Sequence, residues 1–361
     1  MYPFDTYTDL REAVDETADH LEAIGHAPGG DPVLGATRNG RTPSIVLTAG
    51  SHATEHAGVV AAVTLLDRLE TDRQLVVVPS RDPVGVSGLS RAMELATGDA
   101  ASLDAYEMVD RWIREHGDIV FEERDVTIGL VGEYCFASAP AADGLPGTKR
   151  LKAVLTELED DPHRWEQLHG RRIFLVPGQP SVAGTGDFDR LYTLVVAPDG
   201  SRLHLNRYLG SRWAPAESRA VTKLLHDVEP GLFVDIHEYL GDGNWISIRP
   251  MDHADARQNA EQIGEQMNAT HAAAGRKQTP LSEFHPDDGD GDSFLSELEP
   301  GLFDLDYVTR GEGFNATDYA AERGALAFTH ETGMYNPFDD RVTAAVEAVQ
   351  TAVDTYEEIT A

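Results

Sequence analysis

The sequence predicts an α/β protein in which helices cover both faces of a mixed, largely parallel twisted sheet, a three-layer α/β/α arrangement. Residues 44–50 and 74–80 are short apolar runs that end in turn residues, as buried strands do. Residues 56–70 between them have the spacing of a helix. A strand–helix–strand unit of this kind is typical of a parallel sheet.

The remaining elements follow from the same two patterns, period 3.6 for helices and apolar runs for strands. We expect helices at 8–24, 214–231 and 340–359, and further strands at 171–178, 191–200, 232–240 and 325–333. Residues 92–195 are more polar and predict a mostly helical insertion within a single domain that spans residues 1–361.

The composition excludes several classes of protein. Apolar residues make up 41% of the 361 residues, enough for a core, and no tract approaches the roughly 18 apolar residues of a membrane span. The N-terminus is acidic and lacks the apolar segment of a signal peptide, so we expect a cytoplasmic protein. Cys135 is the only cysteine, which excludes an internal disulfide and a cysteine-based zinc cluster.

The formal net charge is −33, and the acidic residues are spread along the whole chain. In dilute buffer such a charge strains a fold by self-repulsion, as in halophilic proteins. At about 1 M salt the Debye length falls to roughly 3 Å and removes most of that repulsion. The charge therefore predicts a protein of a salt-loving cell, such as a halophilic archaeon. It argues against nucleic acid or an anionic membrane as a partner.

The segment HATEH places His52, Glu55 and His56 within five positions and indicates a metal site. Two arrangements fit. In one, His52 and His56 bind the metal from one helix face and Glu55 is the base. In the other, His52 and Glu55 bind and the base lies elsewhere. An apolar strand ends at Gly50, so His52 falls in a strand-to-helix turn, which favours the second arrangement. Open α/β sheets bind their ligands at that edge.

Two more strand ends carry candidate residues. His237 ends the strand at 232–240, and Asp235 lies on the same strand face, where it could orient the imidazole. Glu331 ends the strand at 325–333. Taken alone, each could be a core histidine or a surface carboxylate. Together, two histidines, one glutamate and an open position are the layout of a catalytic zinc, and a nearby carboxylate is the expected base.

These motifs, in this order, resemble the zinc carboxypeptidase superfamily, which includes the succinylglutamate desuccinylase and aspartoacylase branch. GSHATEHAG resembles its first zinc motif and implies His52 and Glu55 as ligands of one Zn²⁺. VDIHEY supplies the third ligand, His237, and FTHETG the catalytic glutamate, Glu331. Arg91, eight residues after Pro83, matches the arginine that polarises the scissile carbonyl in the deacylase branch.

LHLNRYLG resembles the superfamily's Asp-Leu-Asn-Arg motif and implies that Asn206 and Arg207 bind the free carboxylate of the substrate. The chain departs from the pattern at three places: His204 replaces the aspartate, Arg81 and Asp82 precede Pro83 where an asparagine is usual, and Thr54 replaces an arginine.

The resemblance implies a zinc hydrolase that cleaves an amide bond beside a free carboxylate, with a small peptide as substrate. The alternative is a deacylase of N-acyl amino acids. A third reading is a non-catalytic acidic protein that binds calcium. Residues 288–299 resemble an EF-hand loop, with acids at its positions one, three, five and twelve. Ser293 stands where that loop needs glycine, which favours a solvated acidic loop instead.

Overall fold

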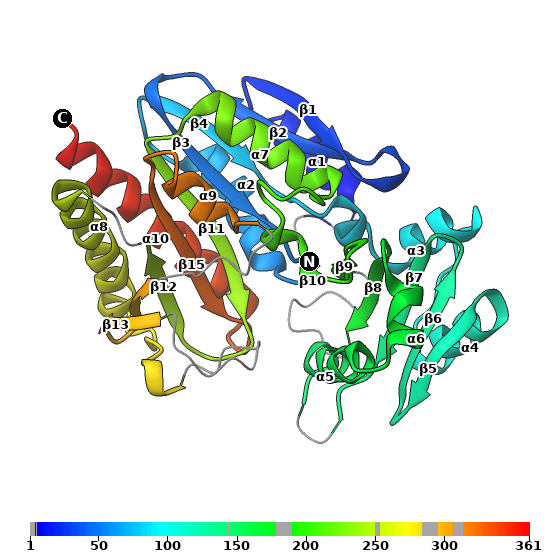
Figure 1. Cartoon of the computed structure of the whole chain (residues 1–361). Coiled ribbons are helices and arrows are strands. Elements are labelled where there is room, and N and C mark those ends of the chain that lie inside the picture. The colour runs from blue at the N-terminus through cyan, green and yellow to red at the C-terminus, as the bar shows by residue number, and fades with distance from the viewer. Residues whose placement is uncertain are drawn as a thin grey trace.

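The computed structural model describes residues 4, 6–142, 145–177, 190–249, 253–283, 295–305 and 313–361, which form two β-sheets with helices (Figure 1). The nine strands of the larger sheet are, in spatial order, β1 (His20–His26), β2 (Pro32–Arg38), β4 (Arg73–Val78), β3 (Arg41–Ala49), β11 (Leu232–Tyr239), β15 (Leu326–Gly333), β12 (Asn244–Ile248), β14 (Leu302–Leu305) and β13 (Leu295–Glu299).

The centre of this sheet is parallel. Strands β4, β3, β11 and β15 pair in parallel, whereas β1, β2 and β13 join antiparallel to their neighbours, and β12 is antiparallel to β15. The predicted mixed sheet is therefore confirmed. The parallel centre matters for function, because it brings the carboxyl ends of β3, β11 and β15 to one edge.

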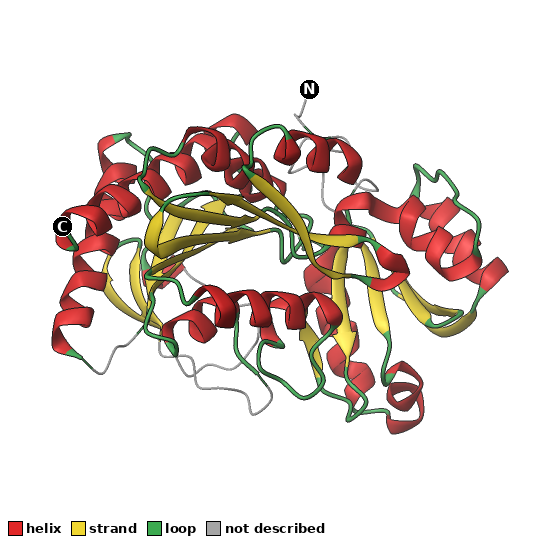
Figure 2. Ribbon diagram, turned by 90° about the horizontal axis from the view of Figure 1, so that it is seen from above, coloured by secondary structure: helices red, strands yellow, loops and turns green. Residues whose placement is uncertain are grey.

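Helices cover both faces of the larger sheet, as Figure 2 shows. One core packs the sheet against α1 (Tyr7–Asp15), α2 (His56–Arg68), α8 (Ala254–Ala273) and α10 (Phe338–Ile359). A second core packs the other face against α7 (Ala216–Val228) and α9 (Ala316–Ala321). Successive residues of one strand alternate between these cores: Ile45 and Leu47 enter the first, and Val46 enters the second. The three-layer arrangement is thus confirmed.

The region expected to be a mostly helical insertion contains a second sheet, so that part of the prediction is wrong. Its strands are, in spatial order, β10 (Arg202–His204), β9 (Tyr192–Val196), β8 (Arg172–Pro177), β7 (Tyr134–Ala139), β6 (Val126–Val131) and β5 (Asp118–Glu123). The helical segments around it are α3 (Pro83–Thr97), α4 (Tyr106–His116), α5 (Gly147–Glu159) and α6 (Pro162–Trp165). The strands expected at 171–178 and 191–200 correspond to β8 and β9 of this sheet.

The helix expected at 8–24 is also wrong in its second half. Helix α1 ends at Asp15, and residues His20–His26 form β1 at the edge of the larger sheet. Pairing of this segment with β2 overrides its helical spacing. Four short 3₁₀ turns complete the described elements: η1 (Pro28–Gly30), η2 (Glu166–Leu168), η3 (Leu205–Arg207) and η4 (Leu281–Glu283). No helix in the described ranges is long and apolar enough to cross a membrane.

Candidate metal centre

The turn between β3 and α2 carries the first two candidate ligands. Gly50 follows β3 with a φ of 57°, and a Cβ there would meet a side-chain atom of Val59 at 2.9 Å, so the turn needs glycine. The Glu55 N–H donates to the carbonyl of His52 at 3.0 Å, and α2 begins at the next residue. His52 therefore lies in the strand-to-helix turn, as the sequence predicts.

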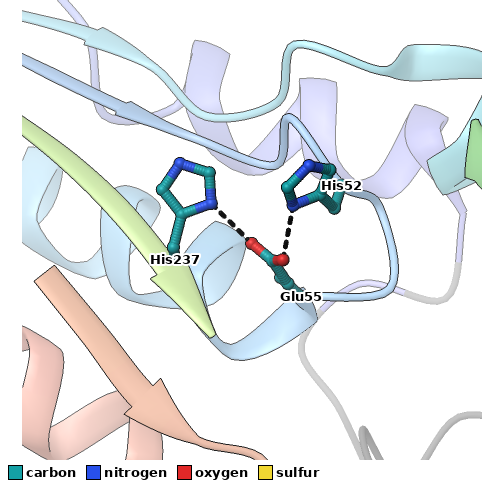
Figure 3. A group of neighbouring side chains, drawn as sticks. All are labelled: His52, Glu55 and His237. Carbon is teal, nitrogen blue, oxygen red and sulfur yellow. Dashed lines mark hydrogen bonds and ion pairs between the residues drawn. The ribbon is translucent and has the colours of Figure 1, made fainter. Parts of the chain in front are cut away.

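Three side chains converge at this edge of the sheet: His52, Glu55 and His237 each offer a ligand atom within 4.8 Å of the other two. The Glu55 carboxylate lies between the imidazoles (Figure 3), with Oε1 2.5 Å from His52 Nδ1 and Oε2 2.8 Å from His237 Nδ1. His56 is not in this group, and its ring packs 6.0 Å from that of Phe338. The structure therefore brings together the side chains of the second arrangement considered from the sequence, in which His52 and Glu55 are the ligands.

The Glu55 carboxylate of this group suits a cation. Burial acts to raise the pKa of Glu55, but the two imidazoles outweigh it and hold that pKa at about 2. Burial acts to lower the pKa of His237, but Asp235 and Glu55 outweigh it and hold that pKa well above its usual range, so the ring carries a proton that a bound cation would have to displace. An anionic carboxylate between two imidazoles is a suitable donor set for Zn²⁺, whose sites in catalytic proteins commonly use two histidines and one glutamate.

A second group of polar side chains lies behind His237. Its Nε2 is 2.8 Å from Asp235 Oδ2, the carboxylate–imidazole contact that orients a metal-binding histidine. Asp235 is fully buried and also accepts hydrogen bonds from Thr48 Oγ1 at 2.7 Å and from Arg81 Nη2 at 2.8 Å. Strand β3, the segment between β4 and α3, and strand β11 are thus joined at one carboxylate.

Glu331 lies beside this cluster. It pairs in register with His237 across the parallel strands β15 and β11, so both side chains project to the same face of the sheet. Its Oε2 is buried and has no hydrogen-bond partner among the described residues. Burial raises the pKa of Glu331 well above its usual range, and this makes its carboxylate a stronger proton acceptor.

The outer side of His52 is covered by residues from the second sheet, which sequence reasoning did not place there. His52 Nε2 is 2.8 Å from His204 Nδ1, and the Tyr192 ring stacks on the His52 ring with centroids 5.0 Å apart. The Lys152 ammonium lies 5.7 Å from the centroid of the Tyr192 ring. The replacement of aspartate by His204 in the Asn-Arg motif was the one signal for this contact.

The other predicted residues are placed as follows. Asn206 contacts both Asp235 and His237, and Arg207 follows it half-buried, donating from Nη1 to the Asn206 carbonyl at 3.1 Å. Arg91 is not brought to the cluster, because its guanidinium pairs with Asp31 and Glu94. The predicted calcium loop falls outside the described residues at 288–294, and residues 295–299 are strand β13.

No protein-family model matches the sequence, and no curated protein does. Solved structures do match the fold. A candidate metallopeptidase from Shewanella amazonensis is similar with a TM-score of 0.50 at 13% identity, over 97% of this chain and 93% of that one. A candidate carboxypeptidase from Burkholderia mallei has a TM-score of 0.50 at 11% identity, over 98% of this chain and 67% of that one. The chain therefore has a carboxypeptidase-like fold.

Proposed function

We propose that this protein is a zinc-dependent hydrolase that cleaves an amide bond beside a free carboxylate, as a carboxypeptidase does on small peptides. The proposal rests on one observation: His52, Glu55 and His237 gather their ligand atoms within 4.8 Å. Glu331, in register with His237, adds a carboxylate at the same edge. These are the parts that a metal-dependent hydrolase needs, namely three ligands and a base.

His52, Glu55 and His237 would hold the Zn²⁺ ion. Bound there, Zn²⁺ supplies a Lewis acid that polarises water and the scissile carbonyl. Glu331 takes a proton from the attacking water and passes it to the leaving amine. Asp235 keeps the His237 ring in place through its contact with Nε2. Arg207 attracts the substrate's free carboxylate, to which guanidinium can donate two parallel hydrogen bonds.

The first experiment measures the metal and the base separately. We expect purified protein to contain about one Zn²⁺ per chain and the His237→Ala variant to contain much less, because one of three ligands is lost. Glu331→Gln keeps its zinc and loses turnover, because an amide cannot accept the proton. The matched control is Glu322→Gln, an exposed glutamate after α9, which keeps both. Full turnover in Glu331→Gln would remove that residue as the base.

The second experiment identifies the substrate. Release of C-terminal amino acids from a dipeptide panel supports the peptidase, whereas hydrolysis of N-acetyl or N-succinyl amino acids alone supports the deacylase. In either case Arg207→Gln raises KM and leaves the zinc content unchanged, because Arg207 acts on the substrate rather than on the metal.

A further inference from the structure

Both ends of the Asn206 side-chain amide are held by neighbouring groups. Its Oδ1 accepts from Arg81 Nη1 at 2.8 Å and from the Ala316 N–H at 3.0 Å. Its Nδ2 donates to Asp235 Oδ2 at 3.2 Å and lies 3.1 Å from His237 Nε2. An amide group offers two donors and two acceptor lone pairs, and because His237 Nε2 is itself a donor to Asp235, one N–H of Asn206 at most is left for a substrate. The residue is also only 5% exposed.

Arg81 is the second buried member of this group, at 3% exposure. Its Nη2 lies 2.8 Å from both oxygens of Asp235, and its backbone N–H donates to the carbonyls of Ala49 and Gly50 at 3.2 and 3.1 Å. Arg81 therefore ties the end of β3, which leads into the His52–Glu55 turn, to the carboxylate that contacts His237. An arginine suits this task because its planar guanidinium donates to several acceptors at fixed angles.

We propose that Asn206 and Arg81 are positioning residues, which fix Asp235 and through it the His237 ring, and that Asn206 does not bind the substrate carboxylate. The inference rests on the proposed function, because it concerns how the metal ligand is held. Asp235 is completely buried, so its orientation depends on its donors. Without Arg81 or Asn206 the carboxylate loses one of the donors that keep it aimed at His237 Nε2, and Thr48 Oγ1 remains as another. Substitutions of such outer partners typically lower metal affinity 10- to 100-fold.

The test compares zinc affinity with steady-state kinetics in two variants, Asn206→Ala and Arg81→Met. Zinc affinity is measured by competition with a chelating dye, which needs no turnover. The matched control is Asn268→Ala, which removes another buried amide, one that donates to Glu299 Oε1 and to the Pro300 carbonyl at the far end of the larger sheet. Circular dichroism checks that each variant is folded.

If the inference is correct, both variants bind zinc about 10- to 100-fold more weakly than wild type and lose kcat, while KM at saturating zinc changes less than about threefold. Arg81→Lys should restore part of the affinity, and Asn268→Ala should keep all of it. Unchanged zinc affinity with a KM raised tenfold or more in Asn206→Ala would overturn the inference and make Asn206 a substrate-binding residue.

A second variant decides the case if Asn206→Ala does not fold. Asn206→Asp keeps the acceptor for Arg81 and Ala316 but removes both N–H donors and places a second carboxylate beside Asp235. It is expected to lose zinc affinity by the same factor, and an unchanged affinity would refute the positioning role. If the wild-type protein binds no zinc at micromolar concentration, that result overturns the proposed function itself and is thereby distinct from a failure of the positioning role alone.

Discussion

A buried pair of histidines predicts acid lability. His271 of α8 and His330 of β15 are both fully buried, with their Nε2 atoms 3.0 Å apart and their rings stacked at 5.2 Å. Burial, helped by the positive charge of Arg276, lowers the pKa of His271 from 6.5 to about 4. The pair therefore stays neutral in the folded protein, and one ring donates a hydrogen bond to the other.

The sign and size of the effect follow from this pKa. Because His271 binds a proton more readily in the unfolded chain, its contribution to stability is complete above pH 6.5 and is lost as the pH falls toward 4. Because pH 5 lies roughly 1.5 units below the unfolded-state pKa of 6.5, the stability lost at pH 5 is about 2 kcal/mol, at 1.36 kcal/mol per unit. With an unfolding entropy of about 0.76 kcal/mol/K for 361 residues, Tm falls by roughly 3 °C.

Many carboxylates titrate in the same range, so the measurement is a difference between two proteins. His271→Gln keeps a hydrogen-bonding partner for His330 but cannot be protonated. We expect chemical denaturation at fixed salt to show that wild type loses about 2 kcal/mol more than His271→Gln between pH 7.5 and pH 5. Equal losses in the two proteins would show that His271 does not carry this pH dependence.

Three further predictions concern salt, a buried ion pair and zinc. Raising KCl from dilute to about 1 M should increase the unfolding midpoint, because the net charge of −33 is then screened; a midpoint indifferent to salt would contradict the halophilic interpretation. Arg341→Met should destabilise the protein by about 3–5 kcal/mol at pH 8, because it leaves Glu238 buried without the Nη1 donor at 2.6 Å. The loss should be smaller at pH 5, since burial raises the pKa of Glu238 to about 7 and it is then protonated; denaturant titrations at both pH values would check this. Zinc at about 1,000 times its Kd should add about 4 kcal/mol and raise Tm by roughly 5 °C in wild type, and calorimetry should show no such shift in His237→Ala.

The central strands of the larger sheet were predictable because they are buried on both faces. Such strands read as continuous apolar runs, and β3, β11 and β15 each end in a polar candidate or the turn that carries one. The three candidate ligands and Glu331 follow from those strand ends. The strand end at Gly50 already favoured Glu55 over His56 in the sequence, and the structure brings Glu55, not His56, to His237.

The second sheet was not predictable in the same way. The turn between β5 and β6 is made by Arg124 and Asp125 at φ values of 54° and 59°, where glycine or asparagine would normally mark a hairpin. Of its strands, β8 and β9 were expected from their apolar runs, whereas β5, β6, β7 and β10 were not. The contacts of Tyr192 and His204 with His52 join residues more than a hundred positions apart, and no local pattern encodes them.

The position of Tyr192 and His204 against His52 has a consequence for protein engineering. A shortened variant in which a short linker replaces residues 118–204 would keep every strand of the nine-stranded sheet. It would also remove the Tyr192 ring that stacks on His52 and the His204 ring that contacts His52 Nε2. The smaller sheet thus covers one side of the candidate metal centre, and a trimmed chain would need other side chains to cover His52.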